Sequence, residues 1–283
     1  MHFVWVQFPK ILAALLLGGF LVSCSEPYFQ SRVSKDKNQG IPIVVPVNPV
    51  EGGGGPTINP PTQVTGIDPS NGSGGKLQPG QSENTAGGGT IYSPQSYSPD
   101  FASPVVVLFN MDTSQWKSIA DRDGFFVVDT NSYNDQRLIF NRLNEAVGIL
   151  EAGYNVDRAR IYFAGWSAGG NIALLNGTNP VNANELAGIM VFPGSGGNYA
   201  RNYLTQASQQ GKRAVPIYYA VGDRDTSTGY YPGVVNEAQI LSQIPGYAER
   251  ITYKVWPEVG HSLHQGAFDE AWKWISQYNS KTN

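Results

Sequence analysis

Residues 161–175 read IYFAGWSAGGNIALL. The β-branched and aromatic residues at the start are typical of a buried strand, and the apolar residues at the end are typical of a helix. Between them lies Gly165-Trp166-Ser167-Ala168-Gly169, in which small residues permit a sharp turn from strand to helix. Such a turn exposes the side chain of Ser167 at the end of the predicted strand.

A G-x-S-x-G pentapeptide is weak by itself in a chain with 33 glycines. The strand before it and the helix after it make the pattern specific for a nucleophile elbow, so Ser167 is our candidate nucleophile. A second serine among glycines, Ser195, also follows a predicted strand, and we interpret it as part of a loop beside the site.

A serine hydroxyl is a poor nucleophile unless an imidazole takes its proton. The chain has three histidines, and His2 lies in a leader-like segment, so the base is His261 or His264. We favour His261 because a loop-like stretch, residues 258–260, delivers it from the end of the predicted strand 251–256. His264 lies one helical turn later and fits a surface or capping role.

The acid that orients the imidazole is expected between nucleophile and base in the chain. The apolar run at residues 215–221 predicts a buried strand, and Gly222-Asp223-Arg224-Asp225 follows it. The segments from Ser167 to Asp225 and from Asp225 to His261 are each long enough to contain a helix and a strand. Asp223 is the alternative, but it lies closer to the strand end, and the neighbouring Arg224 suggests an ion pair of structural character.

Apolar runs of four to seven residues alternate with helix-like stretches between residues 90 and 283. Leu138, Ile139, Leu143, Val147 and Leu150 recur at three- and four-residue steps, as one face of a helix requires. This alternation predicts an α/β domain with a mostly parallel sheet and helices on both faces. Two further strands are expected at residues 104–110 and 186–192.

Residues 90–283 resemble small serine esterases of the α/β-hydrolase superfamily, close to the poly(3-hydroxybutyrate) depolymerase and feruloyl esterase group. The segments that carry the resemblance, in chain order, are residues 104–110, 116–128, 154–165, Gly222 to Asp225, and Gly260-His261. The resemblance implies an α/β-hydrolase fold and the roles of nucleophile for Ser167, acid for Asp225 and base for His261. It also implies esters of plant-wall polysaccharides, hydroxyalkanoate oligomers or small acyl esters as substrates.

One feature of these relatives is missing. They usually carry a His-Gly pair after the early strand, where a backbone N–H helps to hold the oxyanion, but this chain has Asn110-Met111-Asp112 there. Backbone donors suffice for an oxyanion hole, so we expect the N–H groups of Ala168 and Met111 to form it. Because loss of one such donor typically costs on the order of 10² to 10³ in rate, the altered loop bears on efficiency and substrate preference.

The N-terminus predicts export. An apolar segment at residues 11–22 has the length of a signal peptide, and Leu21-Val22-Ser23-Cys24 resembles a bacterial lipobox. Cys24 is the single cysteine and cannot form an internal disulfide, so we expect a signal peptide over residues 1–23 and a lipid anchor on Cys24. An ordinary signal peptide with an incidental cysteine is the alternative. The prediction is an exported lipoprotein of the bacterial cell envelope, at the outer membrane if the cell is Gram-negative.

Residues 24–89 are expected to be a disordered linker. Residues 25–89 contain 13 glycines and 9 prolines, and no aromatic residue lies between Phe29 and Tyr92. The linker would hold the α/β-hydrolase domain, residues 90–283, away from the membrane.

Other site classes have little support. Two histidines three residues apart, without thiols, leave few ligands for a metal, and the proposed chemistry needs no cofactor. A net charge of −3 and a pI near 5.6 make nucleic acid an unlikely partner. Tyr218, Tyr219, Tyr230 and Tyr231 are candidates for an aromatic cleft, although half of them fit the core better.

The sequence therefore predicts a serine esterase that forms an acyl-enzyme, with a small or polymeric ester as substrate. Its alternative is a surface binding protein that keeps the hydrolase fold without efficient chemistry, since the loop at Asn110 and Met111 departs from the family pattern.

Overall fold

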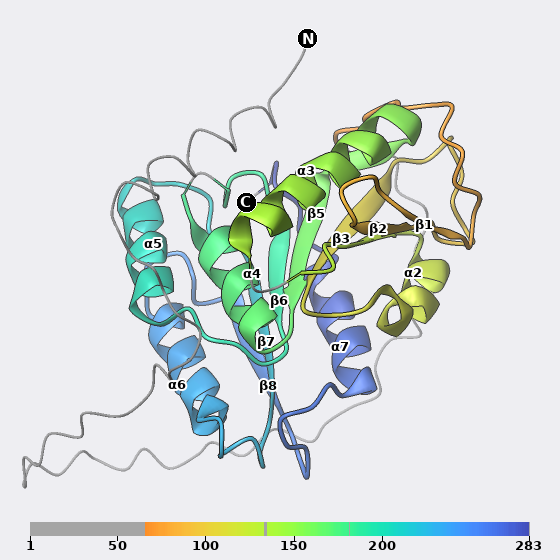
Figure 1. Cartoon of the computed structure of the whole chain (residues 1–283). Coiled ribbons are helices and arrows are strands. Elements are labelled where there is room, and N and C mark those ends of the chain that lie inside the picture. Colours follow the sequence, from red (N-terminus) through yellow and green to blue (C-terminus); the bar gives the residue numbers. More distant parts are fainter. Residues whose placement is uncertain (1–65, 133–134, 181, 283) are drawn as a thin grey trace, which may run out of the picture.

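A computed structural model of the chain describes residues 66–132, 135–180 and 182–282. In this part of the chain, eight strands form one sheet in the order β1-β2-β4-β3-β5-β6-β7-β8 (Figure 1). The strands are β1 Ser82–Asn84, β2 Thr90–Tyr92, β3 Ser103–Phe109, β4 Phe126–Asp129, β5 Val156–Gly165, β6 Gly188–Val191, β7 Ile217–Gly222 and β8 Ile251–Trp256.

Neighbouring strands from β4 to β8 run parallel, whereas β1 and β2 add an antiparallel edge. The helices are η2 Thr113–Gln115, α2 Lys117–Asp123, α3 Gln136–Gly153, α4 Ala168–Thr178, α5 Gly197–Gln209, α6 Tyr230–Ser242 and α7 Gln265–Ile275. Helices α3 to α6 pack on one face of the sheet, and α2 and α7 pack on the other (Figure 1). The predicted mostly parallel sheet with helices on both faces is confirmed.

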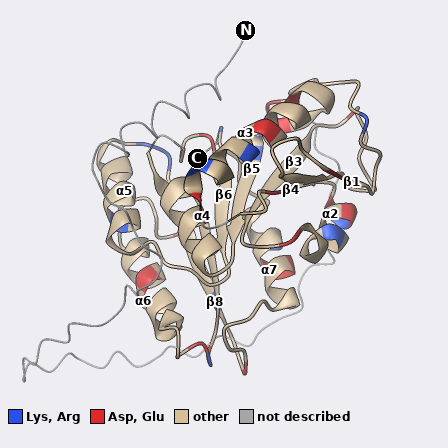
Figure 2. Ribbon diagram, viewed as in Figure 1, with Lys and Arg blue, Asp and Glu red and all other residues tan. Residues whose placement is uncertain are grey.

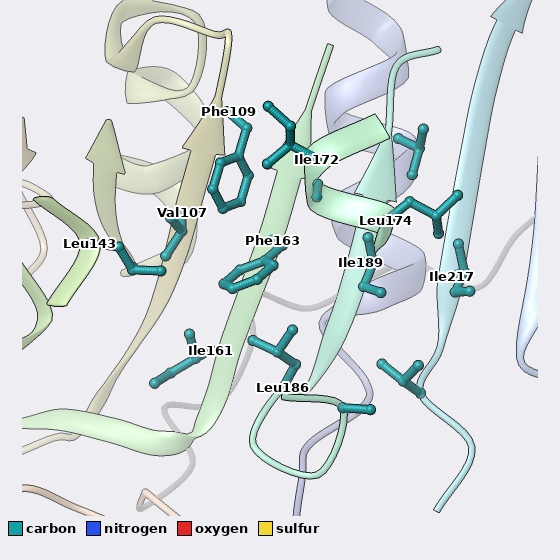
Figure 3. Packing of buried hydrophobic residues seen from close by; sticks show 14 of the residues in the cluster. Val107, Phe109, Leu143, Ile161, Phe163, Ile172, Leu174, Leu186, Ile189 and Ile217 are labelled. Atoms are coloured by element: carbon teal, nitrogen blue, oxygen red, sulfur yellow. The ribbon is translucent and has the colours of Figure 1, made fainter. Parts of the chain in front are cut away.

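The central strands are buried on both faces. In β3, Val107 and Phe109 face the helices α3 to α6, while Val106 and Leu108 face α2 and α7, because successive side chains of a strand alternate between the faces. Figure 3 shows the first of these cores, where the ring of Phe109 lies edge-on to that of Phe163, with centroids 5.0 Å apart. Burial on both faces explains the continuous apolar runs in the sequence.

Helix α4 is the most central of the helices. It carries no charged residue, in contrast to the outer helices (Figure 2), and it packs on β5 and β6. A largely apolar helix without charges is typical of one that its neighbours bury. None of the helices in the described part of the chain combines the length and apolar character needed to cross a bilayer.

The domain begins before residue 90, which differs from the predicted boundary. Within the predicted linker, residues 66–89 pack on the sheet: the backbone N–H groups of Ile67 and Asp68 donate to the buried carboxylate of Asp157, at 2.9 and 3.0 Å. The N–H of Leu77 donates to the hydroxyl of Tyr154 at 2.6 Å, and β1 extends the sheet edge. The predicted linker was therefore wrong for residues 66–89. The predicted signal peptide, Cys24 and the rest of the linker lie outside the described residues.

Candidate active site

Ser167 lies in the turn between β5 and α4, where its backbone adopts φ +55° and ψ −120°. A residue with a side chain rarely takes a positive φ, at a cost of order 1–3 kcal/mol, and the surroundings must hold it there. Here the N–H of Ser167 donates to the carbonyl of Pro193 at 2.7 Å, and its carbonyl accepts the N–H of Asn171 at 3.1 Å. The elbow that the sequence predicts is present and fixed by backbone hydrogen bonds.

The two glycines of the pentapeptide allow the backbone segments to approach closely. A Cβ on Gly165 would lie 2.3 Å from the carbonyl oxygen of Gly169. A Cβ on Gly169 would lie 1.9 Å from the carbonyl oxygen of Phe109, at the end of β3. Both contacts are with backbone atoms, which cannot rotate away as the end of a side chain can, so only glycine fits at either position.

The structure brings together the three side chains predicted from the sequence. The Nε2 atom of His261 lies 3.0 Å from the Oγ of Ser167, and its Nδ1 atom lies 2.9 Å from the Oδ2 of Asp225. Ser167, Asp225 and His261 follow β5, β7 and β8, whose carboxyl ends meet at one edge of the sheet because these strands are parallel. The parallel topology therefore assembles the three groups from distant parts of the chain.

Asp225 is suited to orient the imidazole. Its side chain is fully buried, and the hydroxyl of Thr228 donates to its Oδ1, which leaves Oδ2 for His261. A buried carboxylate at Nδ1 favours the tautomer in which Nδ1 carries the proton, so that Nε2 is free to accept the proton of Ser167. The arrangement is a hydrogen-bonded chain from carboxylate through imidazole to hydroxyl.

Asp223 and His264, the alternative candidates for acid and base, make other contacts. Asp223 accepts the N–H of Glu258 at 2.8 Å, and the adjacent Arg224 pairs with Glu258, so this stretch joins the loops after β7 and β8. His264 immediately precedes α7 and stacks on Trp256, with ring centroids 4.2 Å apart. Asp223 therefore has the structural role that its neighbour Arg224 suggested, whereas His264 stands at the N-cap position of α7 without a capping hydrogen bond from its side chain.

Ser195 is engaged by a carboxylate. Its hydroxyl donates to Glu237 of α6, which also accepts the N–H groups of Gly196 and Gly197 at 2.9 and 3.2 Å. A carboxylate at this place balances the positive end of the dipole of α5. Ser195 therefore joins the start of α5 to α6.

Two aromatic rings stack on the imidazole. The ring centroid of Trp166 lies 5.2 Å from that of His261, with an interplanar angle of 28°, and that of Tyr230 lies 5.4 Å away at 7°. Tyr218 and Tyr219 are buried in β7, whereas Tyr230 and Tyr231 are only partly buried. The expectation that half of the four tyrosines belong to the core is thus confirmed. Trp166 is a site residue that the sequence pattern did not reveal, although its position next to Ser167 was a signal.

The loop after β3 lies against the elbow. Asn110 has φ +55°, and its side-chain amide donates to the carbonyl of Trp166 at 3.2 Å. The side chain of Met111 is buried in the core of α2 and α7, while Ala168 is the first residue of α4, where helix N–H groups lack intrahelical partners. In the described part of the chain, neither the N–H of Met111 nor that of Ala168 donates to another backbone group.

Two carboxylates lie near this loop. The side chain of Ser114 and its backbone N–H hydrogen-bond to Asp112 and lower its pKa. Burial raises the pKa of Asp129, at the end of β4, to about 6, and repulsion from Asp112 adds to the shift. Across residues 66–132, 135–180 and 182–282, no group of three or more metal-ligating side chains gathers.

No family model matches the chain, and a search of curated proteins finds no match. Solved structures do match. A thermostable esterase aligns at a TM-score of 0.50 and 15% identity over 70% of this chain, which spans 62% of that esterase. The BES protein from Bacillus cereus aligns at 0.53 and 13% identity, over 66% of this chain and 89% of that one.

An S-formylglutathione hydrolase from Staphylococcus aureus aligns at a TM-score of 0.51 and 13% identity, over 70% of this chain and 94% of that one. At these identities the likeness establishes the fold alone. Together with the sheet order and the elbow, it identifies the α/β-hydrolase fold that the sequence predicted.

Proposed function

We propose that the chain is a serine esterase that hydrolyses carboxylic esters through an acyl-enzyme intermediate. The observation that carries the proposal is the chain of hydrogen bonds from Asp225 through His261 to Ser167, with Ser167 on a strained elbow. Nucleophile, base and orienting acid within hydrogen-bond reach are the arrangement that acyl transfer requires. Two structural neighbours, a thermostable esterase and an S-formylglutathione hydrolase, support the same class of reaction.

In the proposed reaction, His261 Nε2 takes the proton of Ser167 as the Oγ attacks the carbonyl carbon of the ester. The resulting tetrahedral intermediate collapses, and the alcohol leaves with the proton that His261 carried. A water molecule then attacks the acyl-enzyme, with His261 again as base, which releases the carboxylic acid and restores Ser167. Asp225 stays ionised throughout and stabilises the imidazolium that forms in each half of the reaction.

We assign the oxyanion hole to the backbone N–H groups of Ala168 and Met111. The N-terminus of α4 places a positive dipole end beside the nucleophile. The hydrogen bond from the Asn110 side chain to the carbonyl of Trp166 holds the loop after β3 against the elbow. This contact supports the placement of the next residue, Met111, beside Ser167. Donors of this kind contribute on the order of 10² to 10³ in rate.

The substrate class that we propose is an ester of a polysaccharide-linked acyl group or of a hydroxyalkanoate oligomer. It comes from the resemblance of residues 90–283 to feruloyl esterases and poly(3-hydroxybutyrate) depolymerases. The aromatic rings of Trp166 and Tyr230 beside His261 support it, because such rings bind sugar faces and phenolic groups.

The esterase proposal is tested with the full chain on a panel of short acyl, feruloyl, acetylated-sugar and 3-hydroxybutyrate esters. We expect turnover of at least one ester, loss of that turnover in Ser167→Ala, and retained turnover in Ser195→Ala as the matched serine control. Absence of turnover on every ester by a folded protein would favour the binding-protein alternative. Equal turnover by wild type and Ser167→Ala would refute the assigned nucleophile.

We also propose that Cys24 carries a lipid that anchors the chain to the cell envelope of a bacterium. The apolar segment before Cys24 and the lipobox-like residues Leu21 to Ser23 support this. Expression in a Gram-negative host with an alkyne-tagged fatty acid tests it: label should enter the wild type and be lost in Cys24→Ser. Equal labelling of the two proteins would contradict the anchor.

A further inference from the structure

Tyr230 is tied to the loop that carries the candidate acid. It is the first residue of α6 and follows Gly229, whose φ of +77° lets the chain turn back toward the site. The N–H of Tyr230 donates to the hydroxyl of Thr228 at 3.3 Å, and that hydroxyl donates to Asp225. One short loop, residues 225–230, therefore presents both a carboxylate and an aromatic ring to the imidazole.

The carboxylate and the ring constrain the imidazole in different directions. Asp225 contacts the edge of the ring at Nδ1, which fixes rotation in the plane. Tyr230 stacks on its face, almost parallel at 7°, and opposes tilting of His261 out of that plane. The stack leaves only part of the His261 side chain exposed, at 26%.

The hydroxyl of Tyr230 reaches the nucleophile side of the site. It donates to the Oδ1 of Asn171 at 3.4 Å, and Asn171 lies one helical turn after Ser167 and is bonded to it through the backbone. Asn171 is held in turn by the N–H of Ser195, which donates to its Oδ1 at 2.6 Å.

The Tyr230 hydroxyl is a neutral donor at ordinary pH. Burial raises the pKa of Tyr230, and its hydrogen bond to Asn171 only partly opposes that shift. A neutral hydroxyl keeps its proton for the bond to the Oδ1 of Asn171, whose N–H donates to the carbonyl of Ser167. Tyr231, the next residue, packs against the same core but has no ring contact with His261 among the interactions of the described residues.

We propose that Tyr230 is a positioning residue that holds the imidazole of His261, and through Asn171 the elbow at Ser167, in the geometry for proton transfer. The inference rests on the proposed esterase function and extends it to a residue outside the triad. A purely structural tyrosine would alter stability without a graded effect on turnover.

The test compares Tyr230→Phe, Tyr230→Ala and the control Tyr231→Phe in the full chain, with the best ester from the panel. Tyr230→Phe keeps the stacked ring and loses one neutral hydrogen bond, so kcat should fall about 3- to 10-fold with KM within about twofold of wild type. Tyr230→Ala loses the ring as well, and kcat should fall about 100-fold, because a displaced catalytic group costs this much. Tyr231→Phe should retain wild-type kcat.

The rate of labelling by a fluorophosphonate gives a second readout, since it needs Ser167 and His261 but no ester pocket. It should follow the same order: wild type, then Tyr230→Phe, then Tyr230→Ala. Any other order, or a wild-type kcat in Tyr230→Phe and Tyr230→Ala, would overturn the positioning role. A wild type that neither turns over an ester nor labels would instead refute the esterase function, so the two failures are distinguishable.

Discussion

Gly169 lies directly against Phe109, so that a Cβ on Gly169 would come within 1.9 Å of the Phe109 carbonyl oxygen. The contact joins the start of α4 to the end of β3, and it sets the distance between the elbow and the loop that carries Met111. Because backbone atoms form both sides of it, a methyl group there must push the strand and the helix apart.

We therefore expect Gly169→Ala to lower the free energy of unfolding by about 2–4 kcal/mol, within the range of severe core defects. Gly148 of α3 is the matched control, since a Cβ there meets nothing within 4 Å. Gly148→Ala should instead stabilise by about 0.5–1 kcal/mol through its helix propensity. Urea unfolding of the two variants measures both effects, and equal shifts in the same direction would contradict the packing of the elbow.

Asp225→Asn should lower kcat by about 10⁴-fold while the protein stays folded, because an amide at Oδ2 favours the wrong imidazole tautomer. Asp223→Asn is the control. Its Oδ1 can still accept the N–H of Glu258, so its kcat should stay near that of wild type. Steady-state hydrolysis measures kcat of both variants. A larger loss of kcat in Asp223→Asn would make Asp223, and not Asp225, the acid that orients His261.

The raised pKa of Asp129 predicts that the free energy of unfolding depends on pH. Burial raises its folded pKa to about 6, above the ordinary 3.8, so the folded state holds the proton more tightly than the unfolded state. The stabilisation from this proton is complete below about pH 4 and is lost as the pH rises through 6. Asp129→Asn keeps an acceptor for the N–H of Asn131 and removes the buried charge.

At pH 7 we expect Asp129→Asn to raise the free energy of unfolding by up to about 2–3 kcal/mol, which is the size of a shift of about two pKa units. At pH 4 the gain should largely disappear. Thermal or urea unfolding of both proteins at the two pH values provides the measurement. A gain that is the same at pH 4 and pH 7 would contradict the raised pKa.

The revised start of the domain predicts that residues 66–89 contribute to stability. A chain beginning at residue 90 loses the bonds of Ile67 and Asp68 to Asp157 and the strand β1. Since hydrogen bonds to a buried charge contribute about 1.5–3 kcal/mol each, it should unfold at clearly lower urea than a chain beginning at residue 66. Coincident unfolding curves of the two chains would contradict this role and support a domain that begins at residue 90.

The sequence could predict that Ser167, Asp225 and His261 come together because each follows a strand and the parallel sheet aligns the strand ends. Ser167 was identified by its glycines together with the strand before them and the helix after them. The scarcity of histidine left His261 and His264, and the loop after the predicted strand 251–256 favoured His261. Residues 66–89 could not be placed, since their glycines and prolines are typical of a linker and their partner, Asp157, lies about 90 residues away. The stacking of Trp166 and Tyr230 on His261 also depends on tertiary packing that no local pattern encodes.

Labelling of the full chain with a fluorophosphonate, followed by mass spectrometry of the intact protein and of its peptides, tests the central claim most directly. We expect one adduct per chain, located on Ser167, that is absent from Ser167→Ala and strongly slowed in His261→Ala. No adduct on the folded wild type, or an adduct that persists in Ser167→Ala, would contradict the assignment of Ser167 as a nucleophile activated by His261.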